Sequence, residues 1–404
     1  MTSTVAASEN DLSGAATLRG GRAEIRPLTG LRFFAAAWVV LFHLHFTPGG
    51  DKLAFFTTLQ PVIGLGALGV DLFFVLSGFV IALTYLDSLG PRLRPRAALR
   101  FVWARFSRVW PVFAVVTNLF GAWLLAKSVW GADGKIAFQT VQPDLGPVSW
   151  LRQMFLVQLW SQRYFDGSSW VGPAWSISAE WLAYLLFPVL ALGFFRAARA
   201  PGWLLGAFAV AVMVPTAAVA LAIDDLYYPF SWLVRIAAGF SSGVLVYLAV
   251  RNVRLTGRVR RLAGAAAVLV VLAAVAVLVA NDLLGGDGRG GVIVVLFPVL
   301  VGALALARGG VVRPLGSGAA VHGGRISYSL YLVHVPVLEV TWTAMLRYPA
   351  IAPGTAAGLA VTVAAPLAAL LAAHLLYQLV EEPSRRGLRR LVERRRTPEA
   401  AAAT

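Results

Sequence analysis

Long apolar runs separated by short polar segments recur along almost the whole chain. Ten of these runs can cross a bilayer as helices, because about 20 residues at a rise of about 1.5 Å each cover a hydrocarbon core of roughly 30 Å. They lie at about residues 29–46, 66–86, 109–127, 173–195, 202–222, 229–250, 262–280, 291–307, 326–346 and 355–379. The pattern predicts an all-α fold, a polytopic transmembrane helical bundle with about ten spans.

Composition favours a membrane bundle over a soluble domain. Of the 404 residues 58% are hydrophobic and only 13% are charged, and the mean hydropathy is +0.73. The net charge of +16 comes from short basic clusters between the apolar runs, so it does not indicate a nucleic-acid partner. Most of the 35 Lys and Arg residues fall on one side of the ten spans. The positive-inside rule therefore predicts a multi-pass protein of the plasma membrane with both termini in the cytoplasm.

The spans define one central transmembrane domain, which we expect over residues 25–383. Residues 1–24 are expected to form a disordered cytoplasmic N-terminus, and residues 384–404 a basic cytoplasmic tail held near anionic lipid. The longest loop, residues 128–172, faces outward in this topology. It carries four tryptophans: Trp130, Trp150, Trp160 and Trp170. Their enrichment is typical of a segment lying at the membrane interface, a cover rather than a separate domain.

The first span holds two ionisable residues on one helical face. Arg32 and His43 are eleven residues apart, so at about 100° per residue their side chains lie about 20° apart, with His43 roughly 16 Å deeper. An ionisable residue at that depth indicates function by default. A His that only hydrogen-bonds a neighbouring helix is the competing interpretation. His45 points to nearly the opposite face and is read as an interfacial residue.

The second span carries a carboxylate, Asp71, just inside its outer end. A carboxylate there is costly unless it is paired, and a pair with His43 is one solution. The alternative is that Asp71 sits at the helix N-terminus, where the macrodipole favours a negative charge with no catalytic meaning. Ser77 and Gly78, near the middle of this span, are small enough to let two membrane helices approach closely.

Two arginines lead into the third span and share one helical face. Arg105 and Arg108 are three residues apart, with Arg100 close to the same stripe. Guanidinium groups gathered at a helix end suit bidentate capture of phosphates. The competing interpretation is the cytoplasmic anchor that the positive-inside rule expects of any span.

Polar residues also interrupt the fourth and ninth spans. Glu180 lies about two turns into the fourth span, where an ionised carboxylate must face a cavity or a partner. In the ninth span Tyr331 and His334 are three residues apart and Ser327 lies one turn before Tyr331, which makes a polar stripe along half of the helix. Such residues also occur where a helix only hydrogen-bonds its neighbour.

Assembled in order, these stretches resemble the integral-membrane acyltransferase-3 family, which includes O-antigen, peptidoglycan, nodulation-factor and macrolide O-acyltransferases. The resemblance covers about residues 25–383. The motifs that carry it are Leu28, Gly30, Leu31 and Arg32 followed by His43; Gly69-Val70-Asp71 through Phe79; Arg105-Phe-Ser-Arg108 with Pro111; Trp175-Ser176 with Glu180; Ser327-Tyr328 through His334 and Pro336; and Glu382-Pro383. The resemblance implies ten crossing helices, His43 as the central catalytic residue and acyl-CoA, in particular acetyl-CoA, as a co-substrate on the cytoplasmic side.

Acyl transfer to a hydroxyl needs a base for the hydroxyl proton and donors for the developing oxyanion. His43 is the best candidate base, because its unperturbed pKa lies near physiological pH. Asp71 or Glu180 is expected to orient the imidazole. The candidates for holding CoA phosphates are Arg32, Arg105 and Arg108. The candidates for oxyanion donors or acceptor contacts are Ser327, Tyr328 and His334. The chain has no Cys, which excludes a cysteine nucleophile and thiolate metal sites, and no metal is expected.

The acceptor remains open between a hydroxyl of a sugar or polyketide secondary metabolite and a glycan of the cell envelope. Short outer loops favour the smaller, hydrophobic acceptor. A competing class is a proton-coupled transporter or flippase, in which the buried histidines and Glu180 relay protons. A structural scaffold is a third interpretation, but it leaves every intramembrane ionisable residue unexplained.

Overall fold

The computed structural model describes residues 17–18, 24–47, 53–129, 135–137 and 139–394, and within them the secondary structure is helical, with no strand. The helices are α1 Arg26–His45, α2 Ala54–Ile63, α3 Gly69–Leu89, α4 Pro95–Val129, α5 Pro147–Met154, α6 Trp175–Ala197, α7 Gly202–Ala211, α8 Val214–Ile223, α9 Ser231–Val250, α10 Gly257–Leu283, α11 Phe297–Leu306, α12 Gly318–Arg347, α13 Ala356–Leu376 and α14 Glu382–Arg394. Most of the predicted N-terminal segment, Trp130 and residues 395–404 lie outside these described residues.

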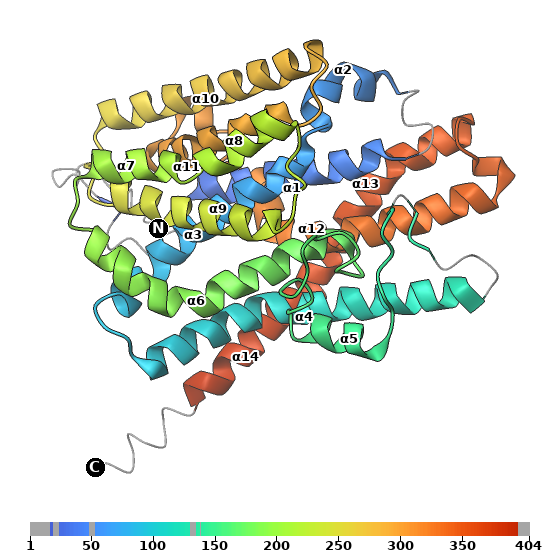
Figure 1. Cartoon of the computed structure of the whole chain (residues 1–404), viewed down its shortest axis with the longest axis horizontal. Coiled ribbons are helices and arrows are strands. Elements are labelled where there is room, and N and C mark those ends of the chain that lie inside the picture. The colour runs from blue at the N-terminus through green and yellow to red at the C-terminus, as the bar shows by residue number, and fades with distance from the viewer. Residues whose placement is uncertain (1–16, 19–23, 48–52, 130–134, 138, 395–404) are drawn as a thin grey trace, which may run out of the picture.

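Ten helical segments of the described chain are long and apolar enough to span a membrane, which confirms the predicted all-α bundle. Figure 1 shows the long helices running side by side, with α12 in the middle. The third span begins earlier than expected, at Pro95, because the Arg-rich stretch before Pro111 continues the same helix. The fifth span is two short helices, α7 and α8, and the eighth joins a 3-10 helix, Arg289–Leu296, to α11.

Glycines set the closest helix contacts. A Cβ on Gly78 of α3 would lie 2.0 Å from the Phe240 carbonyl oxygen of α9, and one on Gly324 of α12 would lie 1.8 Å from the Thr29 carbonyl oxygen of α1. Small residues allow such approach because membrane helices are held together by close packing rather than by a hydrophobic drive. The pairs α3 with α9 and α1 with α12 therefore form the rigid centre of the bundle.

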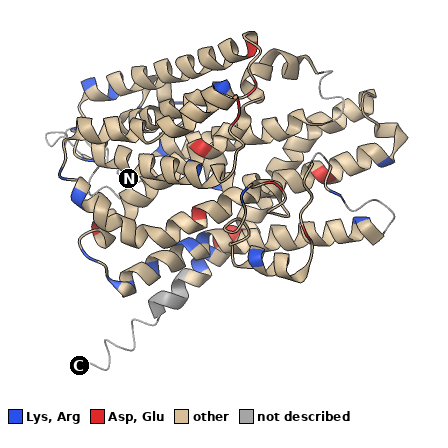
Figure 2. Ribbon diagram, viewed as in Figure 1, with Lys and Arg blue, Asp and Glu red and all other residues tan. Residues whose placement is uncertain are grey.

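Basic residues gather at one end of the bundle. Figure 2 shows Lys and Arg mainly at the end where α4 begins and α14 runs; we call this the basic end and its opposite the distal end. After α13 a π-helical turn, Tyr377–Glu381, leads into α14. There α14 crosses α4, and the Trp103 indole N–H donates to the Leu388 carbonyl at 3.0 Å. The start of the predicted tail is thus helical and packed on the bundle.

The described part of the long loop folds against α4 and α6 at the distal end. Its tryptophans donate indole hydrogen bonds: Trp150 to the Asn118 side chain at 3.0 Å, Trp160 to the Ser178 carbonyl at 3.1 Å and Trp170 to the Asp144 carbonyl at 2.9 Å. Leu156 and Leu159 of the same loop are fully buried. The loop therefore packs as part of the helical domain.

Candidate active site

Two histidines from different helices meet inside the bundle. The Nδ1 atom of His43, near the end of α1, lies 3.3 Å from the Nε2 atom of His334, in α12. His43 Nδ1 also lies 2.8 Å from the Val39 carbonyl oxygen, and His334 Nδ1 lies 3.2 Å from the Leu330 carbonyl oxygen. The close packing of α1 on α12 brings the two rings together, with centroids 4.9 Å apart.

The carbonyl contacts determine which ring nitrogens carry protons. A carbonyl oxygen only accepts, so a hydrogen bond to Leu330 requires a proton on His334 Nδ1 and leaves its Nε2 as an acceptor. His43 Nδ1 then donates, shared between Val39 and His334. In the neutral pair the atom left with a free lone pair is His43 Nε2. This is the proton-accepting atom that a general base needs.

His43 lines a cavity of about 370 Å³ at the distal end, which we call the outer cavity. Its walls come from α1, α3, α6, α9, α12 and the segments that precede α3, precede α5 and connect α5 to α6. They comprise Val39, Phe42, His43, Phe46, Ala67, Val70, Ile136, Ala137, Gln139, Phe165, Asp166, Gly172, Pro173, Trp175, Arg235, Tyr331, Val335 and Trp342. The reactive face of the histidine pair is thus open to a mostly apolar chamber.

A second, smaller cavity of about 50 Å³, the inner cavity, lies beside it towards the basic end. It is lined by Arg32, Val70, Phe73, Phe74, Ser77, Ser176, Ile177, Glu180, Ser327, Tyr328 and Tyr331. Val70 and Tyr331 line both cavities. The Tyr331 hydroxyl lies 2.7 Å from Ser176 Oγ and donates to the Pro173 carbonyl at 2.8 Å. A fixed tyrosine therefore separates a chamber containing His43 from one containing Arg32.

Asp71 pairs with an arginine and not with His43. Its two carboxylate oxygens accept from Arg235 Nε at 2.9 Å and Nη2 at 2.7 Å, and both side chains are buried. The Arg235 guanidinium lies 5.1 Å from the Trp175 ring centroid. The pairing with His43 that the sequence suggested is corrected here, because the bidentate arginine occupies both carboxylate oxygens.

Glu180 lies in the inner cavity, where Arg32 also lies, and not beside His43. One of its carboxylate oxygens accepts from the Tyr184 hydroxyl at 2.6 Å, one turn along α6. The Tyr184 hydroxyl also lies 3.1 Å from Ser77 Oγ. Glu180 is therefore placed to stabilise the positive charge of Arg32 and not to orient the His43 imidazole.

The three predicted phosphate-binding arginines lie at or near the basic end, and they differ in the groups that they contact. Arg108 forms an ion pair with Glu381 of the π-helical turn, which also accepts from Ser329 Oγ at 2.7 Å. Arg105 Nη2 donates to the Tyr85 hydroxyl at 3.2 Å, and the Arg32 guanidinium lies 5.8 Å from the Phe73 ring. In the described part of the chain neither Arg32 nor Arg105 forms an ion pair with a carboxylate.

Ser327 and Tyr328 have backbone partners. Ser327 Oγ donates to the Gly324 carbonyl at 2.8 Å, and the Tyr328 hydroxyl donates to the Val109 carbonyl at 2.6 Å. Both line the inner cavity, and neither lines the outer cavity that contains His43. Among the described residues no group of three or more His, Asp and Glu side chains is arranged to hold a metal ion.

Sequence reasoning missed two members of this site. Arg235 was visible as the charge inside the sixth apolar run, a signal that such a residue needs a buried partner. Glu381 was passed over for the neighbouring Glu382, because only the π-helical turn at Tyr377–Glu381 shows which of the two faces Arg108.

Within the described residues, ten helical segments long and apolar enough to span a membrane surround a cavity lined by His43, which indicates a multi-pass membrane protein. The chain belongs to the acyltransferase-3 family, since the family model described as an acyltransferase domain matches residues 26–373. The resemblance drawn from the motifs is thereby confirmed. Acyltransferase MdmB from Streptomyces mycarofaciens is 29% identical over 162 residues, which cover 40% of this chain and 38% of that protein. No solved structure gives a significant match.

Proposed function

We propose that this protein is a plasma-membrane O-acyltransferase that moves an acyl group, in particular acetyl, from acyl-CoA to a hydroxyl of a sugar or polyketide secondary metabolite. Membership of the acyltransferase family supports the reaction class. The observation that carries the proposal is His43 Nε2, a proton acceptor in a cavity that adjoins a chamber lined by Arg32. A cell-envelope glycan is the alternative acceptor.

The donor enters, in this proposal, from the basic end, on the cytoplasmic side. Arg32 and Arg105 hold the phosphates, since guanidinium groups bind phosphate oxygens with paired hydrogen bonds, and Arg108, already paired with Glu381, adds positive charge beside them. The pantetheine arm passes the inner cavity, along the wall that includes Ser327 and Tyr328. The roughly 16 Å that separate Arg32 from His43 along α1 then set the distance from phosphates to thioester.

In the transfer step the acceptor hydroxyl gives its proton to His43 Nε2 as its oxygen attacks the thioester carbonyl carbon. A new C–O bond forms and the C–S bond breaks. The CoA thiolate that leaves takes the proton from the imidazolium, so the products are the ester and free CoA. His334 positions the imidazole by accepting from His43 Nδ1 and shares its positive charge while the proton is held. The Asp71–Arg235 pair fixes the wall of the cavity.

The test is release of free CoA from acetyl-CoA by the purified protein in detergent, with and without an extract containing hydroxyl acceptors. His43→Ala should lower the rate by about 10²- to 10⁴-fold, the usual contribution of a general base. His45→Ala is the matched control, because that residue lies two positions away and does not line the cavity. Retained transfer in His43→Ala would exclude the base assignment. A wild type that neither binds nor turns over acetyl-CoA would instead favour a proton-coupled transporter.

A further inference from the structure

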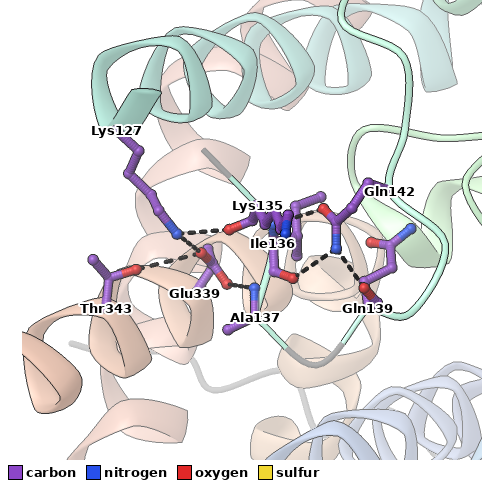
Figure 3. A network of polar contacts seen from close by, with 8 residues as sticks. All are labelled: Lys127, Lys135, Ile136, Ala137, Gln139, Gln142, Glu339 and Thr343. Carbon is purple, nitrogen blue, oxygen red and sulfur yellow. Dashed lines mark hydrogen bonds and ion pairs between the residues drawn. The ribbon is translucent and has the colours of Figure 1, made fainter. Parts of the chain in front are cut away.

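The proposed reaction gives no role to a buried ion pair at the distal end. Lys127 of α4 and Glu339 of α12 approach to 2.7 Å, with side chains 8% and 0% exposed. Burying two charges costs desolvation energy that is recovered only with good geometry and further hydrogen bonds. The other partners of the pair therefore indicate what it holds in place (Figure 3).

These partners are backbone groups of the loop between α4 and α5. Lys127 Nζ donates to the Lys135 carbonyl at 2.7 Å, and the Ala137 N–H donates to Glu339 Oε2 at 2.9 Å. We call Lys127 and Glu339, with these two backbone bonds, the clamp, and residues 135–137 the loop wall. The clamp ties the loop wall to two membrane-spanning helices at once.

A glutamine holds the loop wall between the two bonds of the clamp. The Gln142 side-chain amide accepts from the Ile136 N–H at 2.7 Å and donates to the Ile136 carbonyl at 3.0 Å. Successive backbone groups from the Lys135 carbonyl to the Ala137 N–H thus all bond to side chains (Figure 3). Apolar contact alone has no preferred direction, whereas hydrogen bonds require definite distances and angles, so this network fixes the position of the loop wall.

The loop wall has one side towards water and one towards the outer cavity. It lies between the spans Pro95–Val129 and Gly172–Ala197, outside both. The Lys135 side chain is exposed, whereas Ile136 is only 4% exposed. Ile136 and Ala137 line the cavity that His43 also lines. The loop wall therefore stands between the aqueous surface of the distal end and the histidine pair.

Ala137 also contacts the helices that carry the two histidines. It packs against a buried apolar cluster that includes Leu44 of α1 and Leu338 of α12. Leu44 directly follows His43, and Leu338 directly precedes Glu339. A displacement of the loop wall would thus open an apolar contact beside the reacting atoms.

Water in this chamber would compete with the acyl acceptor. His43 Nε2 can take a proton from water as well as from an organic hydroxyl, because both are O–H donors to the same base. The water oxygen would then attack the thioester carbon, a C–O bond would form, the C–S bond would break, and the CoA thiolate would take the proton. The products would be acetic acid and CoA, so a chamber that excludes water prevents this loss of the acyl group.

We propose that Lys127 and Glu339 are positioning residues that prevent hydrolysis of the acyl donor. The clamp fixes the loop wall, and the fixed loop wall keeps water from the histidine pair, so the acyl group passes to the organic acceptor. This inference rests on the proposed function and adds to it a control over the competing reaction with water.

The first experiment measures the position of the loop wall and needs no turnover. The chain has no Cys, so Ile136→Cys gives a single thiol in the full-length protein in lipid nanodiscs. A charged, water-soluble maleimide should label this thiol more slowly than the thiol of Lys135→Cys, because position 135 is exposed. Adding Glu339→Ala should speed labelling of Ile136→Cys about tenfold, as expected for one or two lost hydrogen bonds, and leave labelling of Lys135→Cys unchanged.

The second experiment measures how the acyl group is divided between water and acceptor. Acetyl-CoA labelled in its acetyl group is supplied with the acceptor extract, and label is counted in acetate and in acetylated product. Glu339→Ala should raise the ratio of acetate to acetylated product about tenfold, because water then enters the chamber. Adding His43→Ala should abolish both products, since both routes use the same base. A purely structural role would lower both products together and leave their ratio unchanged.

Two further variants separate the clamp from general stability. Lys127→Met/Glu339→Met removes both buried charges, so it should fold as well as wild type, but Met cannot bond the loop backbone and both defects should remain. Asp224→Asn is the matched control. The Asp224 carboxylate accepts from the Gly288 and Arg289 N–H groups at 2.7 Å each, so it also holds a loop, but it lines neither cavity. Neither the labelling rate nor the product ratio should change in that variant.

The outcomes separate this inference from the function beneath it. Equal labelling of Ile136→Cys with and without the clamp would overturn the positioning role. An unchanged ratio of acetate to acetylated product in the clamp variants would also overturn it, even if labelling became faster. A wild type that neither binds nor turns over acetyl-CoA would reject the proposed function itself, and protection against hydrolysis would fall with it.

Discussion

Buried charged side chains have different partners at the two ends of the bundle. At the distal end, Asp71 pairs with Arg235 and Lys127 with Glu339, and in both pairs the side chains are at most 8% exposed. Towards the basic end, Arg108 pairs with Glu381. Within the described residues Arg32 and Arg105 form no ion pair and contact aromatic rings and a tyrosine hydroxyl, although Glu180 lines the same cavity as Arg32.

We interpret this difference as a division between charges that stabilise the structure and charges proposed to bind the donor. A buried cation already neutralised by a bidentate carboxylate has little left to offer an anionic substrate. A guanidinium held only by ring faces and one hydroxyl keeps most of its hydrogen-bond donors free. We therefore assign architecture to the distal pairs and donor binding to Arg32 and Arg105, and the predictions below test that division.

The largest effect is expected from Asp71→Asn. Removing one partner leaves the Arg235 charge buried without compensation, which costs about 3–5 kcal/mol of folding free energy. The unfolding temperature in detergent, followed by tryptophan fluorescence, should fall sharply. The double variant Asp71→Leu/Arg235→Met should recover most of the loss, because no unpaired charge remains. An unfolding temperature unchanged by Asp71→Asn would show that the pair does not stabilise the bundle.

Arg325→Gln is the control for that measurement. Its partner is Glu24, and the two side chains are 51% and 36% exposed, so water screens the pair. The hydrogen bond from Arg325 lowers the pKa of Glu24, and this effect exceeds the opposite effect of partial burial, which raises the pKa. The unfolding temperature should barely move, since exposed ion pairs contribute little.

The ten spans followed from hydropathy because each apolar run is as long as the bilayer is thick. The family was predicted from sequence motifs, which a hydropathy profile does not reveal. Pairings did not follow, since Asp71 and Arg235 are 164 residues apart, and Lys127 and Glu339 are 212 apart. A sequence shows that an intramembrane charge needs a partner, but which helix supplies it depends on packing.

The candidate site shows the same limit on a smaller scale. His43 and His334 were both singled out as ionisable residues in apolar helices, but their mutual hydrogen bond depends on the contact of α1 with α12. The glycines that allow this contact, such as Gly324, carry no chemical signal of their own. The sequence suggests Asp71 as a partner for His43 because it gives the depth of each residue along its own helix. It does not give which neighbouring helix each side chain faces.

The next largest effect concerns catalysis. His334→Ala should lower kcat about 10- to 100-fold, because His43 Nδ1 loses the acceptor that holds its ring. The KM for acetyl-CoA should stay constant, and the pH profile of kcat should shift, which loss of folding alone would not cause. His322→Ala, on the same helix but exposed and paired with His374, is the matched control. Equal losses in both variants would argue against a positioning role.

A smaller effect is expected at the basic end. Arg105→Gln should raise the KM for acetyl-CoA about tenfold and leave the unfolding temperature nearly unchanged, the opposite of Asp71→Asn. Acetyl-dephospho-CoA lacks one phosphate, so in the wild type its KM should exceed that of acetyl-CoA. If Arg105 contacts that phosphate, the two KM values should become equal in Arg105→Gln. Arg100→Gln, on the same helix and exposed, should behave as wild type. A fall in stability without a change in KM would place Arg105 with the architectural charges.

The smallest effect is expected from Ser327→Ala. Its hydroxyl donates back to the Gly324 carbonyl within α12, so removing it should change kcat and both KM values by less than about threefold. This variant tests the boundary between the two ends, because Ser327 lines the inner cavity together with Arg32 and Tyr331. A loss above tenfold in kcat with unchanged KM values would mean that the hydroxyl turns from Gly324 to the reacting carbonyl during transfer. The thioester would then lie deeper in the inner cavity than His43 Nε2 implies, and the division between the two chambers would have to be moved towards the basic end.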